Sequence, residues 1–123
     1  MSIDLGQADA DLKAREPIFH RTELGASRTH FDRMTAEDFW EVGASGQMYE
    51  REFIWTVLEQ RYSQAAEDPW IVAEFRVRWL GGDAFLATYH LTQGERLTRR
   101  ATVWTHTSEG WKAQYHQGTV ILH

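Results

Sequence analysis

The chain has 123 residues, of which 42% are hydrophobic and 25% charged, and this composition is typical of one globular domain spanning residues 1–123. The net charge of -5 disfavours nucleic acid as a partner, and the absence of Cys excludes disulfides, thiolate nucleophiles and Cys-ligated metals. We find no apolar run long enough for a membrane span and no signal-peptide pattern at the N-terminus, so we expect a cytoplasmic protein without a membrane partner.

The first part of the chain has the hydrophobic spacing of helices. Residues 8–20 predict a helix that Pro17 bends or restarts, and residues 27–34 predict a short helix that begins at a capping serine. No linker separates these elements, which favours one continuous domain.

A short strand and a longer helix are expected next. Residues 38–43 alternate bulky side chains in an extended pattern, and residues 44–47 have the small and polar side chains of a hairpin-like turn. Residues 49–62 predict an amphipathic helix, which Asp68 and Pro69 separate from the segment that follows.

The second half of the chain predicts four long strands, because β-branched and aromatic residues dominate it. The strands are expected at residues 70–80, 84–93, 96–107 and 111–122. Short glycine-containing connections between them favour an antiparallel meander. Strands of this length must twist, and a curled sheet closed by helices on one side forms a cone with a cavity at its mouth.

Alternation along the strands predicts a polar face that carries several cations. Thr98, Arg100, Thr102, Trp104 and His106 share one face of the third long strand. Arg76 belongs to the polar set of the first long strand, and His116 belongs to a set opposite Trp111, Ala113 and Tyr115 on the last. Exposure of this polar face to solvent is the default interpretation, and a dimer interface or a cationic cavity wall is the alternative.

Three sequence strings resemble a known superfamily. They are residues 38–46 with Tyr49 just after, residues 100–104, and residues 110–113 running into residues 116–119. Together with the order of elements, they are similar to the nuclear-transport-factor-2-like superfamily, in its SnoaL-like and ketosteroid-isomerase-like branch of small bacterial proteins. The resemblance covers residues 12–120.

This resemblance implies an α+β fold in which a cone-shaped, curved antiparallel sheet packs on N-terminal helices, a fold also called cystatin-like. It also implies a cavity and a homodimer, but no particular reaction, because the superfamily contains several enzyme classes and pure binding domains. The general base of ketosteroid isomerases falls on Gly43, which cannot accept a proton. Steroid isomerisation is therefore disfavoured, although Glu41 lies two residues earlier on the same side of the strand.

Two residues are candidates for acid–base catalysis. Glu41 lies among aromatic residues that favour the neutral form of a carboxyl group, and His116 could shuttle a proton. The alternative for Glu41 is an outward-facing structural ion pair, and the alternative for His116 is a structural histidine bonded to backbone or to a carboxylate.

Candidate ligand-binding residues are those that could line an aromatic and partly cationic cavity. They are Trp40, Tyr49, Arg76, His90, Arg100 and Trp104. The arginines could bind a carboxylate or an enolate through their planar guanidinium groups, whereas each tryptophan could equally belong to the core. No histidine pair has metal-binding spacing on a helix, so we expect neither a metal nor a cofactor.

Three functions fit these patterns. The first is a small-molecule-binding domain with an aromatic, partly cationic cavity. The second is a lyase, isomerase or hydrolase that acts on a small organic compound with a Glu or His base. The third is a homodimeric interaction protein whose cone is filled by its own aromatic residues.

Overall fold

The computed structural model describes residues 3–64 and 69–122. The helices are α1 (Leu5–Lys13), the short 3-10 helix η1 (Thr22–Leu24), α2 (Arg28–Met34) and α3 (Arg51–Tyr62). The strands are β1 (Thr35–Val42), β2 (Met48–Glu50), β3 (Trp70–Gly81), β4 (Ala84–Gln93), β5 (Arg96–Thr107) and β6 (Gly110–Val120). Asp68, predicted to help end the third helix, lies outside the described residues.

Side-chain caps explain where the first two helices begin. The Asp4 carboxylate accepts a hydrogen bond from the Gln7 backbone N–H at 2.8 Å, which starts α1 earlier than predicted. Helix α1 ends at Lys13 rather than continuing to residue 20, because a residue that precedes proline, here Glu16, disfavours the helical conformation. The predicted cap of α2 is confirmed, since Ser27 Oγ accepts from the His30 N–H at 3.1 Å.

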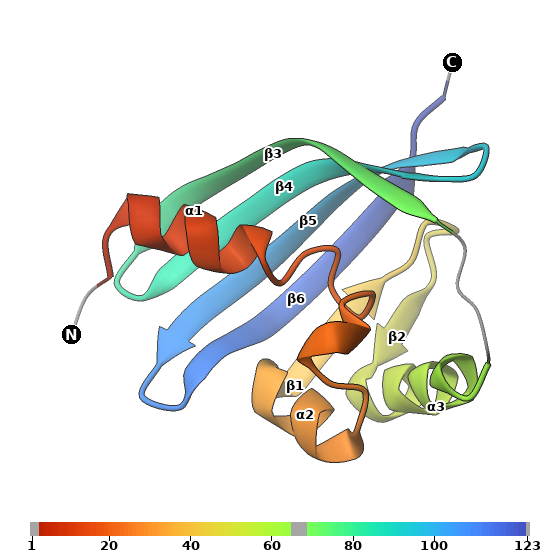
Figure 1. Ribbon diagram of the computed structural model, residues 1–123, viewed down its shortest axis with the longest axis horizontal. Coiled ribbons are helices and arrows are strands. Elements are labelled where there is room, and N and C mark those ends of the chain that lie inside the picture. The colour runs from red at the N-terminus through yellow and green to blue at the C-terminus, as the bar shows by residue number, and fades with distance from the viewer. Residues whose placement is uncertain (1–2, 65–68, 123) are drawn as a thin grey trace.

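The six strands form one curved sheet in the order β2-β1-β6-β5-β4-β3. The predicted meander of four long antiparallel strands is confirmed for β3 to β6, whereas β1 runs parallel to β6. In Figure 1, α1 crosses the β3 side of the sheet, and α2 and α3 lie beside β1 and β2 at its other end. The sheet and these helices enclose the hydrophobic core.

The polar set of β5 faces the helices, so the default expectation of a solvent-exposed face is wrong. Thr98, Thr102 and Trp104 are fully buried, and Arg100 lies between them in the sequence on the same face. These polar groups tolerate burial because each finds a hydrogen-bond partner inside the sheet or below it.

A β-bulge in β6 changes which of its side chains face inward. Tyr115 pairs with Val103 and Ala113 pairs with Trp104, so Gln114 is an extra residue without an opposite partner. Beyond the bulge, His116 shares the inner face with Ala113 instead of opposing it as simple alternation predicted. Strand β3 also has a register shift, between Ala73 and Arg76, and Arg76 lies on the opposite face of the sheet from His116.

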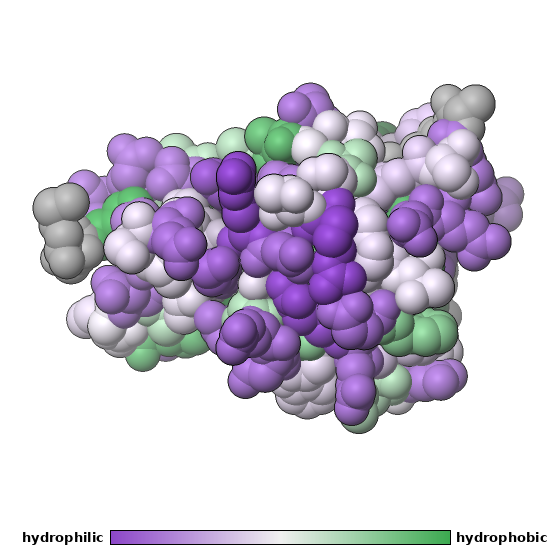
Figure 2. Space-filling view, turned by 90° about the horizontal axis from the view of Figure 1, so that it is seen from below, coloured by the Kyte–Doolittle hydropathy of each residue, from purple (hydrophilic) through white to green (hydrophobic). Residues whose placement is uncertain are grey.

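The view from below shows a mostly hydrophilic surface in which hydrophobic residues are scattered singly or in small groups (Figure 2). Such scattering is ordinary for a globular domain. None of the helices within residues 3–64 and 69–122 has the length and hydrophobicity needed to cross a membrane.

Candidate functional site

Two hollows of similar size lie on opposite faces of the sheet. The inner one, which we name the cone pocket, has a volume of about 530 Å³ and opens between α3, β1 and the inner face of β5 and β6. The other, the outer hollow, has a volume of about 510 Å³ and lies across β3, β4, β5 and β6.

The cone pocket has one apolar wall and one polar wall. The apolar wall consists of Ile18, Phe19, Phe53, Ile54, Val57 and Leu58. The polar wall includes Glu41, Arg61, Gln93, Arg96, Arg100 and His116. Phe53 and Val57 face this hollow and are about half exposed, which explains why an apolar side of α3 is not fully buried. The arrangement suits a ligand with both an apolar and a polar part.

Glu41 is a partly buried carboxylate on the polar wall of the cone pocket. It lies on β1 directly between Tyr49 of β2 and His116 of β6. Burial raises its pKa, and the more distant charges of Arg100 and Arg61 oppose that rise. No hydrogen bond or ion pair joins its side chain to the part of the chain that the structure describes. Its carboxyl group is therefore available to a ligand.

Arg100 brings a positive charge to the same wall. Its Nε donates to Thr98 Oγ1 at 3.1 Å, and its Nη2 lies 3.4 Å from Gln93 Oε1. Burial lowers its pKa, with the nearby Tyr89 and Glu41 acting in the opposite direction. An arginine keeps its charge despite such a shift, so Arg100 places a permanent positive charge on the polar wall.

His116 is a fully buried imidazole on the polar wall. Its Nδ1 lies 2.7 Å from Thr102 Oγ1, whereas its Nε2 is buried without a hydrogen-bond partner among the described residues. Burial, followed by the charges of Arg100 and His20, lowers the pKa of His116 to about 3. The ring is therefore neutral near neutral pH.

A buried carboxylate lies beneath this histidine, and sequence reasoning missed it. Glu16 Oε1 accepts from the Ile18 N–H at 2.7 Å and from the Tyr89 hydroxyl at 2.8 Å, and its Oε2 accepts from Trp104 Nε1 at 3.0 Å. Thr102 is a fourth hydrogen-bonding neighbour. Burial raises the pKa of Glu16, and these four hydrogen bonds lower it against that effect.

The aromatic candidates have three different locations. Tyr49 lines the cone pocket, and its ring approaches Gly43 so closely that a Cβ there would lie 3.0 Å from Tyr49 Cε2. Trp40 lies on the outer face with its ring centroid 4.4 Å from that of Tyr115. Trp104 is completely buried and lines neither hollow. Only Tyr49 of these three could touch a ligand in the cone pocket.

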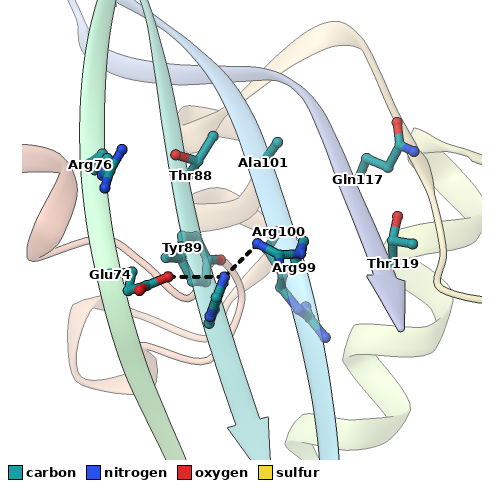
Figure 3. Close-up of a pocket in the computed structure, with 10 residues that line it drawn as sticks. Glu74, Arg76, Thr88, Tyr89, Arg99, Arg100, Ala101, Gln117 and Thr119 are labelled. Atoms are coloured by element: carbon teal, nitrogen blue, oxygen red, sulfur yellow. Dashed lines mark hydrogen bonds and ion pairs between the residues drawn. The ribbon is translucent and has the colours of Figure 1, made fainter. Parts of the chain in front are cut away.

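Arg76 and His90 line the outer hollow rather than the cone pocket. They belong to the adjacent strands β3 and β4, and Figure 3 labels Arg76 together with Glu74 and Arg99 along this hollow. The His90 Nε2 lies 3.2 Å from Glu74 Oε2 and 2.8 Å from Arg99 Nη1. Glu74, His90 and Arg99 already have partners on an open surface, whereas Glu41 and His116 Nε2 have none among the residues that the structure describes.

Structural comparison relates this arrangement to known proteins. A nuclear-transport-factor-2-like protein from Cytophaga hutchinsonii superimposes with a TM-score of 0.74 and 12% identity, covering 97% of this chain and all of that one. The chain has the nuclear-transport-factor-2-like fold. A cystatin-like fold protein from Burkholderia xenovorans gives a TM-score of 0.71 with 16% identity, covering 97% of this chain and 92% of the other.

A further match supports the same fold and names no activity. A protein of unknown function from Pectobacterium atrosepticum matches with a TM-score of 0.72 and 17% identity, covering 96% of this chain and 91% of that one. No family model matches the chain. No curated protein matches its sequence either. The nuclear-transport-factor-2-like fold therefore confirms the expected α+β architecture, and the function must be argued from the cone pocket.

The cone pocket does not resemble a metal site. Within residues 3–64 and 69–122, no three His, Asp or Glu side chains come together in a way that could hold an ion. The pocket instead combines Glu41, Arg100 and His116 from three different strands. Such a set can bind a polar group and exchange protons with it.

Proposed function

We propose that this protein is a small-molecule-binding domain whose cone pocket takes a small organic acid with an apolar body. The observation that carries the proposal is the half-buried Arg100, which shares a hollow of about 530 Å³ with an apolar wall. A carboxylate that enters the pocket can accept hydrogen bonds from the guanidinium group, and its apolar part can pack against α3.

The charge of the lining favours an anion over a cation. Three arginines and one glutamate line the cone pocket, and the glutamate is the group whose ionised form burial disfavours. Arg61 donates from Nη2 to the Phe19 carbonyl, and Arg100 donates from Nε to Thr98 and from Nη2 to Gln93, so each keeps further guanidinium N–H groups for a ligand. An anion would offset the positive potential that these side chains create.

The proposal is tested by thermal unfolding in the presence of phenylacetate and benzoate over a range of concentrations. A ligand that binds the native state raises the melting temperature as its concentration increases. We expect Arg100→Gln to abolish this rise. Arg99→Gln is the matched control, because Arg99 is the adjacent residue, lies on the outer face and contacts His90. Equal responses of the two variants would contradict the proposal.

A second candidate function is acid–base catalysis on a bound compound. Glu41 and His116 are paired residues on adjacent strands, and both are proton-transfer groups that face one hollow. The test is chemical analysis of any acid that stabilises the protein, before and after incubation. Conversion that is lost in Glu41→Gln while binding persists would establish an enzyme, and unchanged acid would leave a binding domain.

The third alternative, an interaction protein with a filled cone, has less support because the cone pocket is hollow. A homodimer could form whether or not the cone is filled. We propose that the protein forms one, and the half-exposed Trp40 on the outer face of the sheet supports this proposal.

A further inference from the structure

We propose that the cone pocket takes a ligand with two anionic groups, the first on Arg100 inside the pocket and the second on Arg96 at its rim, so that the ligand class is a small dicarboxylate with an apolar body. The inference rests on the proposed function and narrows its ligand class. The nuclear-transport-factor-2-like fold alone does not imply it, because it depends on which side chains of this sequence line the pocket.

The first observation is an excess of positive charge in the cone pocket. Its lining contains three arginines, Arg61, Arg96 and Arg100, and a single acidic residue, Glu41. Burial lowers the pKa of His116 to about 3, so this residue adds no charge near neutral pH. Three arginines against one glutamate leave an excess of two positive charges even when Glu41 is ionised. A monoanion would offset one of these charges, whereas a dianion would offset both.

Arg96 supplies a cation at the rim of the cone pocket. It is the first residue of β5, pairs with Gln93 across the turn between β4 and β5, and is exposed while it lines the pocket. No hydrogen bond or ion pair joins its guanidinium group to another residue within 3–64 and 69–122. Arg99 of the same strand instead contacts His90 on the outer face. The N–H groups of Arg96 are therefore available to a ligand.

The side chain of Arg100 extends along β5 towards Arg96. Its Nε donates to Thr98 Oγ1 at 3.1 Å, and Thr98 lies between the two arginines on the same face of the strand. Its Nη2 lies 3.4 Å from Oε1 of Gln93, the residue that pairs with Arg96. Cα atoms four residues apart in a strand are about 13 Å apart, and this orientation of Arg100 shortens the distance that a ligand has to span.

The two guanidinium groups also influence each other. Burial lowers the pKa of Arg100, and the positive charge of Arg96 lowers it further. Like charges that act on each other in this way repel, and an anion between them replaces the repulsion with attraction. A molecule whose two carboxylates are a few bonds apart can place one on each arginine, and both contacts are then charge-assisted hydrogen bonds.

The apolar wall accounts for the remainder of the ligand. Phe53 and Val57 of α3 are about half exposed and line the same hollow as the two arginines. An apolar group that covers these side chains removes their surface from water. A phenyl-substituted dicarboxylic acid combines this group with two carboxylates, so such acids are suitable probes.

The second anion site is tested by isothermal titration calorimetry at neutral pH and constant ionic strength. The probes are phenylmalonate, phenylsuccinate and phenylglutarate, in which the chain between the carboxylates lengthens. Each is compared with the monoacid in which a methyl group replaces one carboxylate. We expect at least one dicarboxylate to bind about tenfold more tightly than its monoacid.

Two variants locate the source of this gain. Arg96→Gln should abolish it and leave the affinity for the monoacids largely unchanged. Arg99→Gln is the matched control, because it removes the same charge from the same strand but on the outer face, and it should retain the gain. Arg96 is exposed, so its variant should fold normally, which the melting temperature without ligand checks. Arg100→Gln should weaken the binding of both kinds of acid.

The outcomes separate this inference from the proposed function. Equal affinity of every dicarboxylate and its monoacid would overturn the inference and leave the organic-acid function standing. A gain that persists in Arg96→Gln, or that Arg99→Gln removes equally, would also overturn it, because the gain would then not come from the rim of the pocket. Failure of every acid to bind would overturn the proposed function together with this ligand class.

Discussion

His116 should make the stability of the protein depend on pH. Its pKa falls from 6.5 to about 3 on folding, so the unfolded chain binds a proton that the native protein rejects. The stability that the neutral ring contributes is present above pH 6.5 and is lost as the pH falls towards 3. For a buried group, such a shift corresponds to a free energy on the order of 5 kcal/mol.

The comparison of wild type with His116→Gln isolates this effect. Glu16 has a raised pKa, so its own contribution is present below 4.5 and is lost as pH rises through its folded pKa, which is the opposite sense. We expect the wild-type free energy of unfolding to fall more steeply than that of His116→Gln between pH 6.5 and 4.5. Urea unfolding at several pH values measures the free energy of unfolding of both proteins. Parallel plots of this free energy against pH would contradict the prediction.

Glu41→Gln should not destabilise the protein. Burial raises the pKa of Glu41 despite the charges of Arg100 and Arg61, so the ionised form is less stable in the native state than in the unfolded chain. The amide removes that cost, and the advantage of the variant should grow as pH rises from 4.5 through the folded pKa. Thermal unfolding checks this, and a lower melting temperature would indicate a structural ion pair.

The sequence predicts part of the candidate site and misses a layer beneath it. Glu41, Tyr49, Arg100 and His116 are candidates that the sequence analysis names, and all four line the cone pocket. Glu16 has no such signal, because its burial depends on Tyr89 and Trp104, which are 73 and 88 residues away in the chain. No local pattern reports contacts at that distance.

At the scale of elements, Trp104 joins β5 to the segment after α1. Its Nε1 donates to Glu16 Oε2, and its side chain is completely buried. Trp104→Phe should lower the free energy of unfolding by about 2–4 kcal/mol, because it removes a buried hydrogen bond to Glu16 and leaves a cavity. Chemical denaturation measures this loss.

Trp79→Phe is the matched control for that experiment. Trp79 also donates a hydrogen bond, to the Gly82 carbonyl at 2.9 Å, but its side chain is 59% exposed. We expect it to cost less than about 1 kcal/mol. Similar losses in the two variants would show that Trp104 does not link the segment to the sheet.

Element boundaries were predicted best where turn chemistry marks them. Strands β4 and β5 have the predicted ends, since glycine-containing turns precede and separate them. The facing of β6 beyond Gln114 was predicted incorrectly, because alternation assumes regular pairing and a bulge breaks it. The polar side of β5 was placed in solvent for a related reason, since alternation separates two faces without showing which one the helices cover.

At the scale of the molecule, the order of elements and the resembling strings together predicted the fold. A further expectation at this scale is that two copies of the chain associate through the sheet. We expect the protein to form a homodimer at micromolar concentration. Sedimentation velocity would measure the mass of the particle and so distinguish a dimer from a monomer. A monomer throughout that range would contradict it, and Trp40→Ala should weaken association if the outer face near Trp40 contributes.

The bulge at Gln114 determines which positions of β6 a mutant library should vary to change the ligand preference of the protein. A randomisation scheme built on simple alternation would pick Tyr115 and Gln117 together with Ala113, and would alter the outer face of β6 beyond the bulge. The positions that border the cone pocket are His116 and Gly118. The extra residue thus changes which side chains of β6 face the cone pocket. Selection experiments must vary the positions that face the pocket after the bulge.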